Sequence, residues 1–499
     1  MPSTLISRRG FMKQSGSTIA GVALAAPSTM AGLTPSSQNS AKTVVAAEAP
    51  PAVTRILADW AVTVRPEDVP QAARREALRT LLNWTGVAIG GSKEAAVDIA
   101  VATLLPYATT GKANLFGRGE RFDPMRAALL AGISSHVLDF DDADLTNLIH
   151  PAGPVASALF PLSQDRLISG ADFLHAFIIG VEIEDRIGNT IYPSHYSMGW
   201  HITGTCGTFG AAAACGRILG LNREQMMDAL GLAATQASGL KIMFGTMAKS
   251  FHPGHAAECG MLAALLAAKG FTASKQAIEG KEGYVYAAST EHDYTKITDG
   301  LGIKYSIMNN GYKPFPSGIV LHSILDGMIQ IHERYHPDPA NVKSIAIRAN
   351  PLVLQLTGKK TPQTGLQAKF SVYHAAAVSL LRGRGGVKGF RMQLPRDPAV
   401  IRLRSLVKVD TDPSVRSDEV YLTVTMKDGT VFTRHVEHAL GTLENPMSDL
   451  QLEAKFRTVV EGILPPRRVD LLLQQLRTLP ELPSAALIPQ SASVQRRHS

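Results

Sequence analysis

Polar, ionisable residues interrupt this largely apolar chain in three places, and they include side chains that transfer protons and hold anions. The first cluster is His136–Asp144, followed by His150; the second is His201; the third is Lys249–His255. Histidine exchanges a proton near neutral pH, and a lysine in apolar surroundings needs an anionic partner. Together these residue types predict an acid–base site that holds an anionic ligand.

His201 stands near the start of the small-residue run Gly199–Ala214, which favours a buried helix. Three glycines at helical spacing lie in this run: Gly204, Gly207 and Gly210. With the alanines that follow, they form a face without bulk, against which a neighbouring helix can pack closely. We expect Thr203 and Thr205 to cap the first turn, and the start of the helix to attract an anion. The run is predicted to be the buried centre of a mostly helical protein.

A metal site is the main alternative use of these side chains. Three aspartates are spaced like an oxygen-ligand loop: Asp139, Asp141 and Asp144. They lack the glycine and the distal glutamate of an EF-hand. His252 and His255 could join His201 as ligands, but no carboxylate motif accompanies that spacing. We therefore predict no metal. A buried histidine is also commonly a hydrogen-bonded core residue, and it is Lys249 nearby that favours the functional interpretation.

Composition predicts a large helical core and excludes nucleic acid as a partner. The chain has 499 residues, 45% of them hydrophobic and 6% aromatic, which favours packing of helix on helix. Of the formal net charge of +8, six positive charges lie in residues 1–47 and 485–499, where no acid offsets them. The remaining body carries about +2, too little for a surface that tracks phosphates.

The N-terminus predicts export. Ser7–Lys13 is a twin-arginine pattern, and the weakly apolar stretch Gly16–Ala26 follows it. We expect a signal peptide over 1–31, a disordered spacer over 32–51, and a periplasmic mature protein. The alternative is a chance arginine pair before an ordinary helix. No later stretch approaches the ~20 apolar residues of a membrane span, so no membrane association is expected of the mature form.

The pattern of hydrophobic residues divides the rest of the chain into parts. Apolar residues at helical spacing predict a helical domain over 52–305, without strands. Its expected helices are 70–91, 94–107, 124–137, 170–187, 201–219, 223–238, 256–269 and 274–279. Alternating residues and the hairpin signal Lys427–Gly429 predict a smaller α+β domain over 306–440. Helices over 441–480 are expected to return to the first domain, before a disordered tail over 481–499.

Five segments together resemble the MmgE/PrpD family, in the order in which that family has them. The segments are His136–Asp142, His150-Pro151, Gly199–Gly204, Gly245–His252 and Lys313–Pro316. The similarity runs from about Ala52 to Leu476 and includes Glu444–Ser448. The family contains 2-methylcitrate dehydratase, cis-aconitate decarboxylase and iminodisuccinate epimerase.

The resemblance implies a large all-helical domain with a smaller α+β lid domain, usually in a homodimer. It also implies a small di- or tricarboxylate substrate and no metal or organic cofactor. The residues it would make catalytic are Asp139, His150, His201 and Lys249. Those it would make substrate-binding are His252, Lys313 and His322.

The chain departs from the family pattern at the substrate end of the expected pocket. Ala143 stands where the family usually has threonine, and Gly318 where it often has cysteine or histidine. The interval from Asp139 to His150 is one residue longer than in the decarboxylase. These departures leave the individual substrate open.

We interpret the chain as a lyase, with dehydration of a 2-methylcitrate-like hydroxy acid as the leading reaction. The alternatives are decarboxylation of a cis-aconitate-type acid, epimerisation at a carboxylate-bearing carbon, and an exported binding protein without catalysis. Lys249 and imidazolium groups would stabilise charge developing on a carboxylate. His201 would move the proton, with His150 as the complementary acid or base. Asp139 would hold an imidazole in its working tautomer, or act as the base itself.

Overall fold

The computed structural model describes residues 51–108, 111–390 and 394–494. Its first helices are α1 Val53–Thr63, α2 Gln71–Gly91, α3 Ala95–Leu104, α4 Pro124–His136, α5 Ala152–Asp165, α6 Gly170–Ile191, α7 Ser194–Ser197, α8 Ile202–Ile218, α9 Arg223–Ala234, α10 Ala248–Ala268, α11 Tyr284–Ala288 and α12 Thr295–Thr298. The later helices are α13 His322–Tyr335, α14 Leu352–Thr357, α15 Gly365–Ala368, α16 Val372–Arg382, α17 Pro398–Ser405, α18 Asp449–Val460, α19 Pro466–Arg477 and α20 Leu487–Ala492. The strands are β1 Ala113–Asn114, β2 Arg121–Phe122, β3 Asp142–Asp144, β4 Asn310–Tyr312, β5 Val342–Ala349, β6 Val407–Thr411, β7 Val420–Met426 and β8 Val431–Val436.

Helix α8 is the buried centre of the helical part, as the small-residue run predicts. Every residue from Ile202 to Gly216 is buried, and α5, α6 and α10 pack around it. A Cβ on Gly260 of α10 would lie 2.5 Å from the Cβ of Ala211, so this helix approaches α8 very closely. A Cβ on Gly210 would lie 2.6 Å from the buried carboxyl of Glu184. The glycines therefore make room for a helix backbone and for one carboxyl group.

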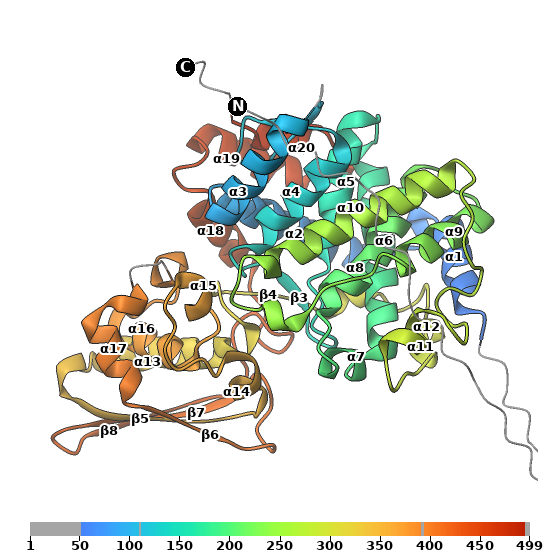
Figure 1. Cartoon of the computed structure of the whole chain (residues 1–499). Helices are drawn as coiled ribbons and strands as arrows, with labels where there is room; N and C mark the ends of the chain where they lie inside the picture. The colour runs from blue at the N-terminus through green and yellow to red at the C-terminus, as the bar shows by residue number, and fades with distance from the viewer. Residues whose placement is uncertain (1–50, 109–110, 391–393, 495–499) are drawn as a thin grey trace, which may run out of the picture. The chain divides into compact units, whose positions relative to one another are not determined.

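A four-stranded sheet forms the core of the smaller α+β part (Figure 1). Its order is β6-β5-β7-β8, with β5 parallel to β6 and antiparallel to β7. The β7–β8 hairpin turns at Lys427–Gly429, as expected, and Gly429 has a φ of 92°. Helices α13 and α16 cover one face and bury apolar residues such as Ile345 and Leu422. The chain is thus mainly α with a smaller α+β part, which confirms the predicted fold class.

Several local expectations are wrong. Between residues 52 and 305 there are three short strands, of which β3 pairs with β4 outside that range. Helix α10 begins at Ala248 rather than Ala256, because Pro253 is accommodated inside it. The segment 274–279 forms turns instead of a helix. These strands are too short to show an alternating pattern in the sequence.

The end of the chain is more ordered than predicted. The tail expected to be disordered from residue 481 contains α20, whose Ile488 and Ala492 are buried in the main helical core. The burial of apolar side chains stabilises this helix, although the sequence of the segment has only a weak helical pattern. The predicted signal peptide and nearly all of the spacer lie outside the described residues. Within the described residues, no helix has both the length and the apolar character needed to span a membrane.

Candidate active site

A short strand pair brings two distant parts of the chain together at the site. Strand β3 follows α4, and its Asp142 pairs with Tyr312 of β4. Lys313 comes directly after β4, so its backbone N–H reaches the carbonyl of Asp141 at 3.4 Å. Asp139 lies in the turn before β3 with a φ of 52°, a left-handed conformation that non-glycine residues seldom adopt. Such local strain is often found at functional sites.

One carboxylate holds two buried ammonium groups. Asp139 Oδ1 accepts hydrogen bonds from Lys249 Nζ at 2.8 Å and from Lys313 Nζ at 2.5 Å. All three side chains are buried, and Asp139 Oδ2 has no partner among the described residues. Although burial alone would raise it, the two lysines hold the pKa of Asp139 well below its usual range. Burial lowers the pKa of Lys249, whereas Asp139 and Asp141 raise that of Lys313 against the effect of burial.

The hydrogen bond at Nδ1 fixes the tautomer of His150. Its Nδ1 lies 2.6 Å from the carbonyl oxygen of Asp142, which can only accept, so the proton is on Nδ1. The backbone N–H of His150 donates to Thr203 Oγ1 at 3.0 Å. Burial and Lys313 place the pKa of His150 well below its usual range. The ring is therefore neutral, and Nε2 carries a free lone pair.

His201 is paired with His252. Their Nδ1 atoms lie 2.9 Å apart, so one ring donates and the other accepts. Burial and then Lys249 lower the pKa of His201 well below its usual range, and burial lowers the pKa of His252 to about 4. If His252 donates, the proton of His201 is on Nε2. If His201 donates, its Nε2 is a base. The direction of this hydrogen bond therefore determines whether His201 Nε2 can act as an acid or as a base.

The sequence analysis did not assign His136 and Asp141 to the site, although both lie in its first cluster. His136 Nδ1 donates to Asp141 Oδ2 at 2.5 Å. The His136 ring centre lies 4.8 Å from that of His150 and 5.8 Å from that of His201. Burial lowers the pKa of His136 despite the carboxylate. Asp141 and the Asp142 carbonyl are thus the groups that orient imidazoles, so the first of the two roles expected of Asp139 is wrong, and its role as a base stays a prediction.

Two further buried lysines support the backbone of the same segment. Lys369 Nζ donates to the carbonyls of Val137 and Leu138, at 3.1 and 2.6 Å. Lys455 Nζ donates to the Phe140 carbonyl at 2.6 Å, the Lys313 carbonyl at 2.8 Å and Asn83 Oδ1 at 2.7 Å. Burial lowers the pKa of Lys369 to about 8 and that of Lys455 to about 7. Each of these hydrogen bonds joins residues more than 140 positions apart, and local sequence patterns do not reveal such contacts.

The structure brings five of the seven predicted site residues to one small cavity of 40 Å³. They are Asp139, His150, His201, Lys249 and Lys313. His252 lies behind His201 and contacts it without lining the cavity. His322 lines a neighbouring cavity instead, with its Nε2 3.4 Å from the carbonyl of Ser317. In this structure His252 contacts His201, and His322 does not line the cavity that holds Lys249 and Lys313.

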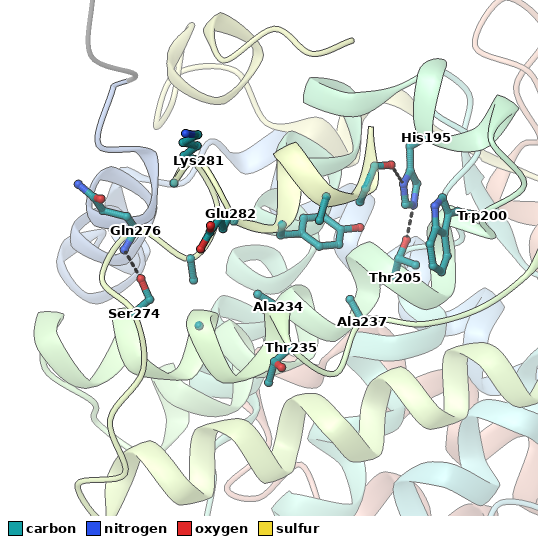
Figure 2. Close-up of a pocket in the computed structure, with 17 residues that line it drawn as sticks. His195, Trp200, Thr205, Ala234, Thr235, Ala237, Ser274, Gln276, Lys281 and Glu282 are labelled. Carbon is teal, nitrogen blue, oxygen red and sulfur yellow. Dashed lines mark hydrogen bonds between the residues drawn. The ribbon is translucent and has the colours of Figure 1, made fainter. Parts of the chain in front are cut away.

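The threonines of the small-residue run do not cap α8. Thr203 accepts from the backbone of His150, and Thr205 bonds to His195 Nε2 at 2.8 Å. Figure 2 shows His195 and Thr205 on the wall of a separate cavity of 780 Å³, together with Trp200. None of the seven predicted site residues lines it. The threonines instead connect α8 to its neighbours.

A bound cation does not suit the side chains that could ligate it. Three groups of three have ligand atoms within 4.8 Å of one another: Asp418, His438 and Glu444, which lie outside this site, and two groups within it, His136, His150 and His201, and Asp139, Asp141 and His150. Lys313 Nζ already lies 2.5 Å from Asp139 and 3.6 Å from Asp141. An ammonium at that position would repel a metal ion. The two lysines provide donors for an anion instead, and His201 Nε2 adds another when His252 donates to its Nδ1.

Matches to known proteins cover nearly all of the residues that the structure describes. Residues 55–297 match the MmgE/PrpD N-terminal domain, and residues 315–478 match the MmgE/PrpD C-terminal domain. Cis-aconitate decarboxylase of Mus musculus is 27% identical over 438 residues, which cover 83% of this chain and 88% of that protein. Cis-aconitate decarboxylase of Aspergillus terreus is 27% identical over 455 residues, covering 84% and 92%. 2-Methylcitrate dehydratase of Cupriavidus necator is 24% identical over 393 residues, covering 71% and 78%.

Proposed function

The chain belongs to the MmgE/PrpD family, and on that premise we propose that it is a cofactor-independent lyase acting on a small tricarboxylate. One observation carries the proposal. Two buried ammonium groups, Lys249 and Lys313, share one carboxylate oxygen in a small cavity that two neutral imidazoles also line. Lysines and histidines in that arrangement bind a carboxylate and transfer a proton beside it.

The ammonium pair is the anchor for a substrate carboxylate. Each ammonium has three N–H donors, and Asp139 takes only one from each. The cavity walls include Phe244 and Phe370, each with its ring centre 5.1 Å from Lys249 Nζ. Electrostatic attraction is strong in such a water-poor site. The bound anion also raises the pKa of His150 and His201 from their lowered values, so either ring can take up a proton once substrate is present.

Decarboxylation is the first reaction to test, because the relatives called cis-aconitate decarboxylase cover more of this chain than the dehydratases do. The bond between a carboxylate carbon and its neighbour breaks, and carbon dioxide leaves. The electron pair stays on the substrate carbon, where a carboxylate held by Lys249 and Lys313 shares the charge. A C–H bond then forms with a proton from His201 Nε2, and the ring regains a proton from solvent. Each turnover consumes one proton.

Dehydration of a 2-methylcitrate-like acid is the second candidate, and the tautomer of His150 favours it. His150 Nε2 is a free base and can take the proton next to a carboxylate. His201 can donate to the departing hydroxyl if His252 donates to its Nδ1. The C–H and C–O bonds break, a double bond forms, and water leaves. This route needs no net proton.

Proton NMR in D₂O distinguishes these reactions. The mature protein is incubated with cis-aconitate, 2-methylcitrate and a panel of di- and tricarboxylates. Bicarbonate with a lighter acid indicates decarboxylation, and a new alkene from a hydroxy acid indicates dehydration. Deuterium uptake without a new product indicates epimerisation. Tight binding of an acid with no reaction would contradict the proposal and favour a binding protein.

A homodimer is proposed as the working assembly. Five exposed apolar side chains from two adjoining segments support it: Met198, Leu240, Ile242, Met247 and Phe251. The Trp200–Leu240 bridge holds these segments together. Light scattering should give twice the chain mass, and Ile242→Lys should lower it. A monomer at all micromolar concentrations contradicts the dimer.

Export to the periplasm by the twin-arginine route is proposed on the pattern Ser7–Lys13. Fractionation of a bacterium that expresses the whole chain should find a shortened protein in the periplasm. Replacing both arginines, by Arg8→Lys and Arg9→Lys, should retain the full-length protein in the cytoplasm. Equal export of both forms contradicts the route.

A further inference from the structure

His136 is a buried histidine beside the catalytic cavity that the proposed reactions do not use. It is 1% exposed and does not line the cavity that holds Lys249 and Lys313. Its Nδ1 donates to Asp141 Oδ2 at 2.5 Å, which leaves a lone pair on Nε2. That Nε2 atom is buried and has no partner among the described residues. A buried polar atom without a partner is costly, so it calls for a functional explanation.

His136 belongs to a group of three imidazoles with the two that line the cavity. Its ring centre lies 4.8 Å from that of His150 and 5.8 Å from that of His201, whereas those two centres are 6.3 Å apart. One ring nitrogen from each of the three histidines lies within 4.8 Å of the other two. Nδ1 of every ring already contacts another group, so Nε2 is the atom that each ring has left. A bridging water or a tilt of one ring spans such a separation, and His136 is the neighbour that both catalytic rings share.

Asp141 makes His136 the favoured place in this group for an additional proton. Burial lowers the pKa of His136, and the Asp141 carboxylate raises it against that effect. Burial places the pKa values of His150 and His201 well below their usual range. An imidazolium at His136 would form a charge-assisted hydrogen bond with Asp141 without any change of partner.

The proposed dehydration leaves its two imidazoles in the wrong protonation states for a second turnover. His150 Nε2 has gained the proton from the broken C–H bond, and His201 Nε2 has lost a proton to the departing hydroxyl. One proton must pass from His150 to His201 before the next substrate can react. In the decarboxylation only His201 has lost a proton, and it needs one again.

We propose that His136 is the residue that returns the proton to His201 after each turnover. The imidazolium of His150 gives its Nε2 proton to His136 Nε2, and the positive charge then lies beside Asp141. His136 passes a proton from Nε2 to His201 Nε2 and is neutral again, so the transfer neither creates nor consumes a proton. In the decarboxylation, His150 takes the proton from solvent at the cavity and passes it on by the same route. This inference rests on the proposed function and adds a proton-relay residue to it, one that does not touch the substrate.

His136→Asn removes the relay and keeps the contact with Asp141. The Asn amide can donate to that carboxylate in place of Nδ1, while the Nε2 base is lost. Rapid-quench measurements with 2-methylcitrate and with cis-aconitate separate the first turnover from the later ones. We expect a burst of one product per site at the native rate, followed by turnover slowed at least about a hundredfold, as for the loss of one proton transfer. Added imidazole, which can protonate His201 after product leaves, should restore part of the later turnovers.

His175 supplies the matched control. It is also buried, its Nε2 lies 3.1 Å from the Val64 carbonyl, and its Nδ1 has no partner among the described residues. It does not line the catalytic cavity. His175→Asn therefore removes the same kind of half-paired buried ring, and it should leave the first and the later turnovers unchanged. Circular dichroism confirms that both variants are folded.

A second measurement does not depend on turnover. In native protein labelled at the histidine nitrogens, NMR reports which ring nitrogens carry protons, and the short hydrogen bond to Asp141 identifies the signals of His136. The added ligand is propane-1,2,3-tricarboxylate, which is saturated and cannot react by these routes. At about pH 6.5, near the pKa of a free imidazole, we expect its binding to add a proton to His136 Nε2.

The outcomes separate the inference from the proposed function. First and later turnovers that slow equally in His136→Asn overturn the inference, because the residue then acts on the chemistry or on the fold. Later turnovers at the native rate overturn it too, even though the acids react. Binding that adds no proton to His136 also counts against it. Uptake of a proton by His136 while no acid reacts supports its part in holding the proton and contradicts the lyase.

Discussion

Asp139→Asn tests the ion cluster most severely, because it removes the one carboxylate that holds both lysines. In the native chain Asp139 Oδ1 lies 2.8 Å from Lys249 Nζ and 2.5 Å from Lys313 Nζ. Asn has nearly the same shape and can still accept hydrogen bonds, so the change is mainly one of charge. Asp141 remains 3.6 Å from Lys313, but no other carboxylate within 4.0 Å of Lys249 is described.

The expected loss of stability follows from the alternatives open to Lys249. If it stays charged, breaking a buried ion pair costs about 3–5 kcal/mol. If Lys249 gives up its proton, deprotonation at pH 7 costs about 1.4 kcal/mol for each pH unit below its unfolded pKa of ~10.4, which is about 5 kcal/mol in total. Both routes lead to the same range. We therefore expect Asp139→Asn to lower the free energy of unfolding by about 4 kcal/mol at pH 7.

The pH dependence of this loss gives the sharper test. If Lys249 gives up its proton in the variant, the folded state binds fewer protons than the unfolded state between pH 7 and pH 10, so its stability should rise with pH. The difference from the native protein should shrink by up to about 1.4 kcal/mol per pH unit over that window. Asp139 contributes to the stability of the native protein down to about pH 4, because its pKa is lowered in the folded state. Below that pH the native protein loses this contribution. The difference should shrink there too.

Urea unfolding at pH 5, 7 and 9 measures these differences, with Asp165→Asn as the control. Asp165 is exposed, and its replacement should change stability by less than about 0.5 kcal/mol. A loss below about 1 kcal/mol for Asp139→Asn refutes the reasoning, because the lysines then find other partners or are already neutral. A large loss that does not vary between pH 7 and 9 means that Lys249 stays charged in the variant.

Three further predictions concern single groups of the site and its support. His201→Gln should lower kcat/KM by at least about a hundredfold, as expected for loss of acid–base catalysis, and near-normal turnover on the true substrate would contradict its role. Lys455→Met should destabilise the chain by about 1–3 kcal/mol for each acceptor left unpaired. It should also reduce the rise in stability between pH 7 and 10 to which its pKa of about 7 contributes, and an unchanged urea titration would contradict both. Gly210→Ala should cost about 1–3 kcal/mol in thermal or urea unfolding, because its Cβ would lie 2.6 Å from the Glu184 carboxyl, and a neutral effect would show that Glu184 can move aside.

Long helices and alternating strands were predictable from the sequence, because each has a pattern that repeats over many residues. Helix α8 and the β7–β8 hairpin are examples. The pair β3–β4 was not predictable, since three residues per strand give no repeat, yet this pair places Lys313 beside Asp141. Helix α10 begins at Ala248 instead of the predicted residue 256, and it contains Pro253.

The members of the candidate site were largely predictable by residue type, and their pairings were not. Asp139, Lys249 and Lys313 line one cavity as the resemblance implies. Asp139 was expected to hold an imidazole or to act as a base, and its hydrogen bonds go to lysines that lie 110 and 174 positions away. It also expected imidazolium groups, whereas burial and neighbouring ammonium groups keep His150 and His201 neutral. Such pairings and pKa shifts depend on tertiary contacts.

The central claim is that Lys249 and Lys313 jointly bind a substrate carboxylate between two imidazoles. A crystal structure with propane-1,2,3-tricarboxylate tests it directly. We predict a carboxylate oxygen about 3 Å from both Nζ atoms, with the rest of the ligand beside His150 and His201. A ligand bound in the cavity lined by Trp200 and His195, or any ligand position that leaves both ammonium groups uncontacted, would contradict the account.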